Sequence, residues 1–288
     1  MTDHMENIKV KGEGEGDLSR NVTREDILRR IQTAENVWLP KDVFEKLYLN
    51  PERKVAGDLR AKFGNPTPAA LTGFVISATP YAVSNMGWRG AGGLGGALIT
   101  VMIFFGGMIQ IIAAIGEWII GNTFSMCLFF TYGTFWIVAG TQLIPWFAVG
   151  DEYSTPMGQT FAGMATPSYY ATFGFYYLAL AMLTTIFAVC ALRTNIILFS
   201  ALFTLIFAFG SGAGALWNFA EGNVESGEKL FVAAGAFTFA LTMMVWYLLL
   251  VQLLESVDFP ITLPVGDLSG WIKGKSEKAA QRKAQAGA

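Results

Sequence analysis

The sequence has few of the side chains on which metal sites, disulfides and most enzyme centres depend. Its 288 residues include one His and two Cys. His4 lies in a polar stretch, whereas Cys127 and Cys190 lie within apolar runs, where each is predicted to pack as a small hydrophobic residue. No nucleophile–base pair or metal cluster can be assembled from these three residues, so neither an enzyme nor a cofactor site is expected.

Charge is also scarce, and what there is lies mostly towards the two ends. Charged residues make up 15% of the chain and the net charge is -2. No recognition motif accompanies the basic residues, so a nucleic-acid partner is not expected. Hydrophobic residues, in contrast, make up 53% and form several runs of about 20 residues, the length that crosses a bilayer. The composition therefore predicts an all-α integral membrane protein in a lipid bilayer.

Six transmembrane helices are predicted, and the basic residues orient them. The apolar runs lie at 68–87, 96–120, 123–149, 168–190, 194–217 and 230–254. On this topology 18 of the 20 Lys and Arg residues share one side, leaving Arg89 and Lys229 on the other. Because Lys and Arg are retained on the cytoplasmic side, both termini are predicted to be cytoplasmic.

Three regions follow from this pattern. Residues 1–62 form a cytoplasmic extension, predicted to be disordered at first and then to form short helices near 23–28 and 37–50. The second of these could lie on the membrane surface or dock beneath the bundle. Residues 63–254 form the six-helix domain, and 255–288 form a cytoplasmic tail.

Polar residues interrupt the second and third apolar runs. Gly106, Gln110, Ala113 and Glu117 fall within roughly 60° of one another on a helix, and Asn122 follows in the turn. An ionisable residue at such a depth is a functional hypothesis by default. Glu117 could carry a proton with a solute, or it could brace the turn by hydrogen bonding, which is the interpretation that we favour.

A proline-rich motif precedes the first helix. Asn65, Pro66 and Pro68 predict a stiff, non-helical segment, because proline restricts its neighbours and has no N–H group. Such a segment could leave the first N–H groups of the helix free to attract a carboxylate at a substrate mouth. The alternative is an ordinary proline-led helix start.

Aromatic residues recur at helical spacing on three of the predicted helices. Spacing of this kind most often reflects packing, and the alternative is the wall of a pathway. The three rows are Phe74–Ala78–Tyr81–Asn85, Ser125–Phe129–Tyr132–Trp136 and Phe199–Phe203–Phe207–Gly210.

Several of these motifs together resemble the acetate uptake transporter family of bacterial succinate-acetate permeases and fungal acetate transporters. The resemblance covers roughly 37–264, and Ala69 and Ala70 depart from the family's usual Leu and Gly. The residues that carry it are Asn65-Pro66-Thr67-Pro68, Phe105-Gly106-Gly107, Gln110, Glu117, Gly121-Asn122-Thr123-Phe124 and Tyr132-Gly133-x-Phe135-Trp136.

The resemblance implies a transporter or channel for acetate and related short-chain monocarboxylates in the plasma membrane. Transport could also be linked to protons, because acetic acid and acetate interconvert. The resemblance further implies a homo-oligomer, a hexamer with one pathway per subunit. Family members have a narrow apolar girdle, which here would comprise Phe74, Tyr132 and either Phe203 or Thr204. The hydroxyl of Tyr132 could in addition bind the carboxylate.

Two other functions stay open at this point. One is export of ammonia or ammonium, which the altered positions 69 and 70 would favour if the helix start no longer attracts an anion. The other is a non-transporting oligomeric scaffold or sensor in the membrane.

Overall fold

The computed structural model describes residues 63–268 together with 278, 282 and 285. The all-α prediction is confirmed for these residues, in which one isolated bridge is the sole β-type pairing. The principal elements are α4 (Thr67–Asn85), η2 (Gly93–Leu98), α5 (Ile99–Val101), the π-helix η3 (Met102–Ile109), α6 (Gln110–Ile119), α7 (Thr123–Thr141), α8 (Thr160–Met164), α9 (Pro167–Ala191), α10 (Ile196–Ala220) and α11 (Val224–Ser256).

Five stretches of the described chain are long and apolar enough to cross a membrane. They contain 19 to 33 residues, close to or above the 20 or so that the hydrocarbon core requires. These stretches are the run from η2 to α6, at Gly95–Ile119, and the helices α7, α9, α10 and α11. Each coincides with one of the six predicted helices.

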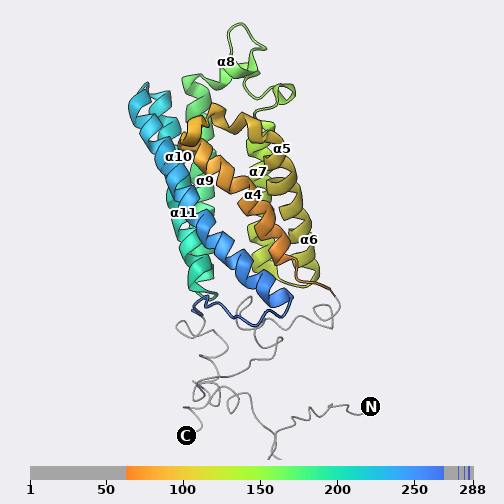
Figure 1. Ribbon diagram of the computed structural model, residues 1–288. Helices are drawn as coiled ribbons and strands as arrows, with labels where there is room; N and C mark the ends of the chain where they lie inside the picture. The colour runs from red at the N-terminus through yellow and green to blue at the C-terminus, as the bar shows by residue number, and fades with distance from the viewer. Residues whose placement is uncertain (1–62, 269–277, 279–281, 283–284, 286–288) are drawn as a thin grey trace, which may run out of the picture. The chain divides into compact units, whose positions relative to one another are not determined.

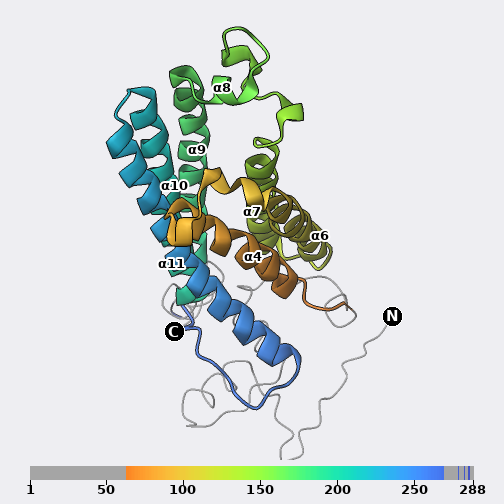
Figure 2. The same cartoon turned by 45° about the horizontal axis from the view of Figure 1, so that its top comes forward.

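The remaining long helix, α4, has a more polar composition and lies among the others. It contacts α11, η3, α6 and α7, and Figures 1 and 2 show it between the α9–α11 group and the helices α5 to α7. One of its polar side chains bonds to a neighbouring segment. Ser77 is fully buried and donates a hydrogen bond to the carbonyl of Val101 over 3.1 Å. Because α4 is surrounded by other helices and not by lipid, it does not need a fully apolar surface.

Side-chain caps define where two of the spanning helices begin. Thr166 accepts a hydrogen bond from the N–H of Tyr169 at the start of α9, where Pro167 takes the first helical position. Asn195 accepts one from the N–H of Leu198 over 2.8 Å at the start of α10. These caps are local, so they fix the starts of α9 and α10 independently of packing.

Two glycines of the π-helix η3 allow it to approach α7 closely. A Cβ atom at Gly106 would lie 2.5 Å from Cγ of Trp136, and one at Gly107 would lie 2.4 Å from a side-chain carbon of Ile137. Both positions therefore require glycine, because contacts this short are excluded for a side chain. The wider π turn was not predicted from the sequence, since helical periodicity assumes 3.6 residues per turn.

Two predicted helix ends were wrong. α7 ends at Thr141 instead of 149, and a separate 3-10 turn, η4 (Pro145–Phe147), follows it. Proline disfavours helical backbone in the residue before it, which explains the break at Ile144. α11 begins at Val224 instead of 230, with Glu225 in its first turn, where a negative charge is favourable.

A segment after α11 crosses the end of the bundle to the connection between α9 and α10. The N–H of Ile196 donates to the carbonyl of Gly266 over 2.8 Å, and the hydroxyl of Tyr247 donates to that of Pro264 over 2.7 Å. Residues 264–268 thus tie the α9–α10 connection to α11. The predicted extension 1–62, with its two short helices, and half of the predicted tail 255–288 lie outside the described residues.

Candidate functional site

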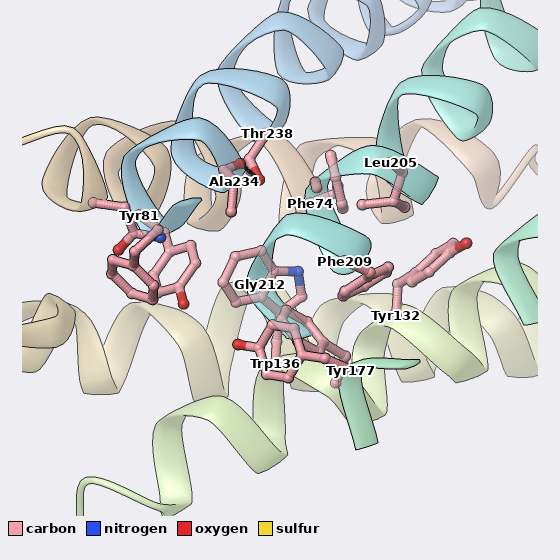
Figure 3. Close-up of a pocket in the computed structure, with 14 residues that line it drawn as sticks. Phe74, Tyr81, Tyr132, Trp136, Tyr177, Leu205, Phe209, Gly212, Ala234 and Thr238 are labelled. Carbon is pink, nitrogen blue, oxygen red and sulfur yellow. Dashed lines mark hydrogen bonds between the residues drawn. The ribbon is translucent and has the colours of Figure 1, made fainter. Parts of the chain in front are cut away.

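A small cavity lies between α4, α7, α9, α10 and α11. Its volume is about 40 Å³, against roughly 10–15 Å³ for a single water measured in this way. It therefore has room for about three water-sized groups, and its wall is mainly apolar and aromatic. Figure 3 shows Tyr81 towards one end of the cavity, Phe74, Leu205 and Tyr132 towards the other, and Trp136 and Gly212 between them.

The Phe74 end of the cavity is apolar. Phe74 comes from α4, Tyr132 from α7, and Leu205 and Phe209 from α10. The rings of Tyr132 and Phe209 are stacked, with centroids 6.5 Å apart and planes inclined by 19°. Three different helices therefore contribute large apolar groups at one level of the bundle.

Tyr132 turns its ring, and not its hydroxyl, towards this cavity. The hydroxyl lies 3.1 Å from Oγ1 of Thr184 on α9, and both side chains are buried. Thr184 is not among the residues that line the cavity. The predicted contact between this hydroxyl and a carboxylate is therefore replaced by a hydrogen bond between two helices.

The opposite end of the cavity is more polar. Tyr81 lies there and Asn85 follows it by one turn of α4; both line the cavity, as do Tyr177 and Thr238. The Thr238 hydroxyl donates to the carbonyl of Ala234 in its own helix over 2.8 Å. The side-chain oxygen of Asn85 is buried and has no hydrogen-bond partner. Polar groups that can serve a solute are therefore found at the Asn85 end, and not at the end ringed by Phe74.

The first two predicted rows supply much of this wall. Phe74, Tyr81 and Asn85 of the first row line the cavity, as do Tyr132 and Trp136 of the second. Phe135, beside Trp136 in the motif that these residues share, lines it as well. Residues from two distant parts of the chain are thus brought together as neighbouring faces of α4 and α7.

The third row lies elsewhere, and neither Phe203 nor Thr204 lines the cavity. Phe203 is 49% exposed on the outer side of α10, and the Thr204 hydroxyl donates to the carbonyl of Ser200. Leu205 lines the cavity in their place. One residue turns a helix by about 100°, so the aromatic row indicated the wrong face of this helix.

The residues of α10 that line the cavity had a detectable signal. Leu205, Ala208, Phe209 and Gly212 follow helical spacing and alternate large with small side chains. That mixture is typical of a face packed against other membrane helices. Tyr177 on α9 was also missed, because no motif of the sequence pointed to it.

Gln110, Glu117 and Asn122 are all buried, away from the cavity. Glu117 is fully buried and its carboxylate accepts a hydrogen bond from the hydroxyl of Thr67 at the start of α4. Gln110 donates to the carbonyl of Gly106 over 2.7 Å, and Asn122 donates to Ser125 over 2.9 Å. The Glu117 side chain thus connects two helices, whereas its backbone carbonyl accepts from Asn122 in the turn.

The start of α4 offers no free amide in its first turn, contrary to the prediction. The N–H of Thr67 donates to the side chain of Asn65, those of Ala69 and Ala70 donate to the carbonyl of Pro66, and Pro68 has none. Pro66 also packs on α6, where a Cβ atom at Gly116 would lie 2.9 Å from it. The proline motif therefore holds the start of α4 against α6.

Metal-ligating side chains do not gather in the part of the chain that the structure describes. There, no group of three His, Cys, Asp or Glu side chains comes close enough to hold an ion. What remains as a candidate site is the aromatic cavity.

A family model described as the GPR1/FUN34/yaaH family matches residues 47–270. The chain belongs to this family. The match covers every helix from α4 to α11, so the membership rests on the part of the chain that forms the cavity. The family resemblance drawn from the sequence motifs is thereby confirmed.

Three known proteins are similar to this chain. Protein alcS of Aspergillus fumigatus is 43% identical over 81% of this chain and 86% of its own length. Ammonia transport outward protein 2 of Saccharomyces cerevisiae is 31% identical over 62% of this chain and 60% of its own. Acetate permease A of Emericella nidulans is 26% identical over 75% and 70%.

The structure of the bacterial acetate channel SatP superposes with a TM-score of 0.54 at 25% identity, covering 71% of this chain and 99% of SatP. Nearly all of that channel therefore has a counterpart among the helices described here. Together with the five apolar helices, this likeness identifies a multi-pass membrane protein with the fold of a channel.

Proposed function

We propose that the chain moves acetate and related short-chain monocarboxylates across the plasma membrane. The observation that carries the proposal is the apolar ring of Phe74, Tyr132 and Leu205 at one end of a cavity, in a fold shared with an acetate channel. The permease name of a relative supports the same solute.

The apolar ring of Phe74, Tyr132 and Leu205 selects among solutes because a solute must lose its water of hydration to pass it. An inorganic ion loses its hydration without compensation between apolar side chains, whereas acetate presents a methyl group to them. The cavity volume of about 40 Å³ favours a solute of few atoms. Size and partial apolarity together, and not a fixed charge, set the preference.

In this proposal α4 is the sixth crossing and both termini are cytoplasmic. Support comes from the length of α4, 19 residues, and from its contacts with α11, η3, α6 and α7. The segregation of Lys and Arg in the sequence supports the orientation. The Phe74 end of the cavity then lies on the cytoplasmic side of the Asn85 end, because α4 begins at Thr67.

Glu117 and the motif at Asn65, Pro66 and Pro68 are proposed to act together as a brace beside the cytoplasmic mouth. The hydrogen bond from Thr67 to Glu117 and the contact of Pro66 with Gly116 support this role. Transport can still be linked to protons, because acetate and acetic acid interconvert in water. Gln110 and Asn122 extend the buried polar stripe of which the brace is part.

A homo-oligomer, a hexamer by family resemblance, is part of the proposal. The outer face of α10 supports it, because Phe203 is 49% and Phe207 is 45% exposed in one continuous row. A row of large apolar groups on an outer helix suits either lipid or a neighbouring subunit.

Ammonium or ammonia is the second candidate solute. The relative named as an ammonia exporter favours it, and so does the aromatic wall, because ring faces attract cations. Ammonium and a carboxylate make opposite demands on hydrogen bonding, since ammonium only donates and a carboxylate only accepts, whereas ammonia can do both.

The test is uptake of labelled acetate into liposomes that hold the purified protein, with Leu205→Ala compared against Phe203→Ala. Both substitutions are on α10, but only Leu205 lines the cavity. We expect protein-dependent uptake, with Leu205→Ala admitting propionate and butyrate faster relative to acetate and Phe203→Ala keeping the parent's ratio. No uptake above empty liposomes, in a folded preparation, would contradict the proposal and leave ammonium flux or a non-transporting scaffold.

A further inference from the structure

We propose that the indole N–H of Trp136, with the side-chain amide of Asn85, forms a binding subsite for the solute's carboxylate in the cavity. This inference rests on the proposed function and adds the groups that recognise the charged end. Neither residue belongs to the apolar ring, and both line the same cavity.

Trp136 carries a donor without a partner. The side chain is 2% exposed, and its Nε1 has no hydrogen-bond partner in the protein. An indole N–H donates only, and buried ones usually find an acceptor. In Figure 3 the ring nitrogen is turned towards the middle of the labelled side chains. The acceptor that this geometry calls for is therefore a group inside the cavity.

The ring that carries this donor is held rigidly. Tyr81 and Phe135 meet it edge to face, with centroids 5.5 and 5.2 Å away. On another side the backbone of Gly106 lies against it, where a Cβ atom would come within 2.5 Å of Cγ. Packing from three helices thus fixes the direction of the N–H bond in advance, which lowers the entropy that binding costs.

Asn85 supplies the second polar group. It follows Tyr81 by one turn of α4 and lines the cavity, and its Oδ1 is buried without a partner. An amide offers two N–H donors and one acceptor, so rotation of the Asn85 side chain about its Cβ–Cγ bond presents the donors to a carboxylate. The site then has donors towards Asn85 and apolar groups towards Phe74, which matches the two ends of acetate.

The donor type selects between solute classes. A carboxylate accepts hydrogen bonds only, so the N–H of Trp136 complements it. Ammonium has four N–H groups and no lone pair, so it gains nothing from the N–H of Trp136 and would depend on the ring faces and on Oδ1 of Asn85. The subsite therefore favours a carboxylate over ammonium.

The test replaces Trp136 with residues that keep an aromatic ring and remove the N–H. Trp136→Phe is the first variant, and β-(3-benzothienyl)alanine at position 136 is the second, since it keeps the two-ring shape. We expect the apparent KM for acetate to rise roughly tenfold or more in both, the effect of losing one hydrogen bond to a charged group. The order of preference among monocarboxylate chain lengths should stay that of the parent, because the apolar ring is intact.

Trp217→Phe is the matched control. Trp217 lies in α10 and its indole donates to the carbonyl of Ala171 over 3.2 Å, outside the cavity. This variant should unfold at a lower temperature and keep the parent's KM for acetate. A benzothienyl variant with the parent's KM would overturn the inference even if Trp136→Phe is impaired.

The outcome for the parent separates this inference from the proposed function. Parent protein that transports acetate while the benzothienyl variant is unaffected refutes the subsite alone. Parent protein that moves ammonium and not acetate refutes the proposed function, and the subsite with it.

Discussion

The hydroxyl of Tyr132 and Oγ1 of Thr184 lie 3.1 Å apart between α7 and α9, and both side chains are buried. The bond holds the Tyr132 ring against the cavity while it satisfies the hydroxyl within the protein. Tyr132, which by its chemistry resembles a substrate-binding residue, therefore also connects two helices.

Removing either partner of this bond should destabilise the protein. Tyr132→Phe and Thr184→Val each leave one buried hydroxyl unpaired, at a cost of about 1–3 kcal/mol. The double variant should cost clearly less than the sum, because no unpaired hydroxyl remains. Thermal unfolding in detergent measures all three, and strictly additive losses would argue against the bond.

The brace between Thr67 and Glu117 predicts a specific pattern of losses. Thr67→Ala removes the donor and Glu117→Ala the acceptor, so each should lower stability, by about 1–3 kcal/mol for a buried polar contact. Glu117→Gln keeps an acceptor oxygen and should lose less.

The same variants separate a brace from a proton carrier in uptake assays. As a brace, Glu117→Gln leaves the response of acetate uptake to an inward proton gradient unchanged. If Glu117→Gln abolishes that response while Thr67→Ala retains it, Glu117 carries the proton and the brace interpretation fails.

Gly106→Ala should displace Trp136 and lower acetate uptake. The added methyl group would lie 2.5 Å from Cγ of Trp136, and crowding of this kind costs about 1–3 kcal/mol. Gly210→Ala is the matched control, because a Cβ there meets nothing within 4 Å. That variant should gain roughly 0.5–1 kcal/mol from helix propensity. Equal effects of the two substitutions on unfolding temperature and uptake would contradict the packing argument.

The capping bond of α10 predicts a difference between two asparagines. Asn195 accepts from the N–H of Leu198, whereas Asn223 before α11 makes no side-chain capping bond. Asn195→Ala should therefore lower the free energy of unfolding by about 1 kcal/mol, the usual value of such a cap. Asn223→Ala should have the smaller effect, and the reverse order in thermal unfolding would refute the assignment.

Short motifs of the sequence indicate both the family and two of the helices that form the cavity. The positions of the five spanning helices follow from the apolar runs, because a helix that crosses a bilayer needs about 20 apolar residues in succession. Phe74 and Tyr132 follow from motifs with fixed spacing, and both line the cavity. Such signals are local, so they can be read without knowledge of the neighbouring helices.

Rotation of a helix about its own axis is not a local property. Leu205 and not Phe203 reaches the cavity, because packing against α9 and α11 decides which side of α10 faces inwards. The partners of polar groups are equally non-local. Tyr132 bonds to Thr184 and Glu117 to Thr67, each pair about 50 positions apart.

The sequence by itself therefore determined the family, the helical class and the approximate extent of the membrane-length helices, since each depends on short runs and fixed spacings. Only the tertiary structure decided which faces meet at the cavity and which buried polar atoms remain for a solute. The reason is that hydrogen bonds and close packing join residues that are neighbours in space and distant in the chain.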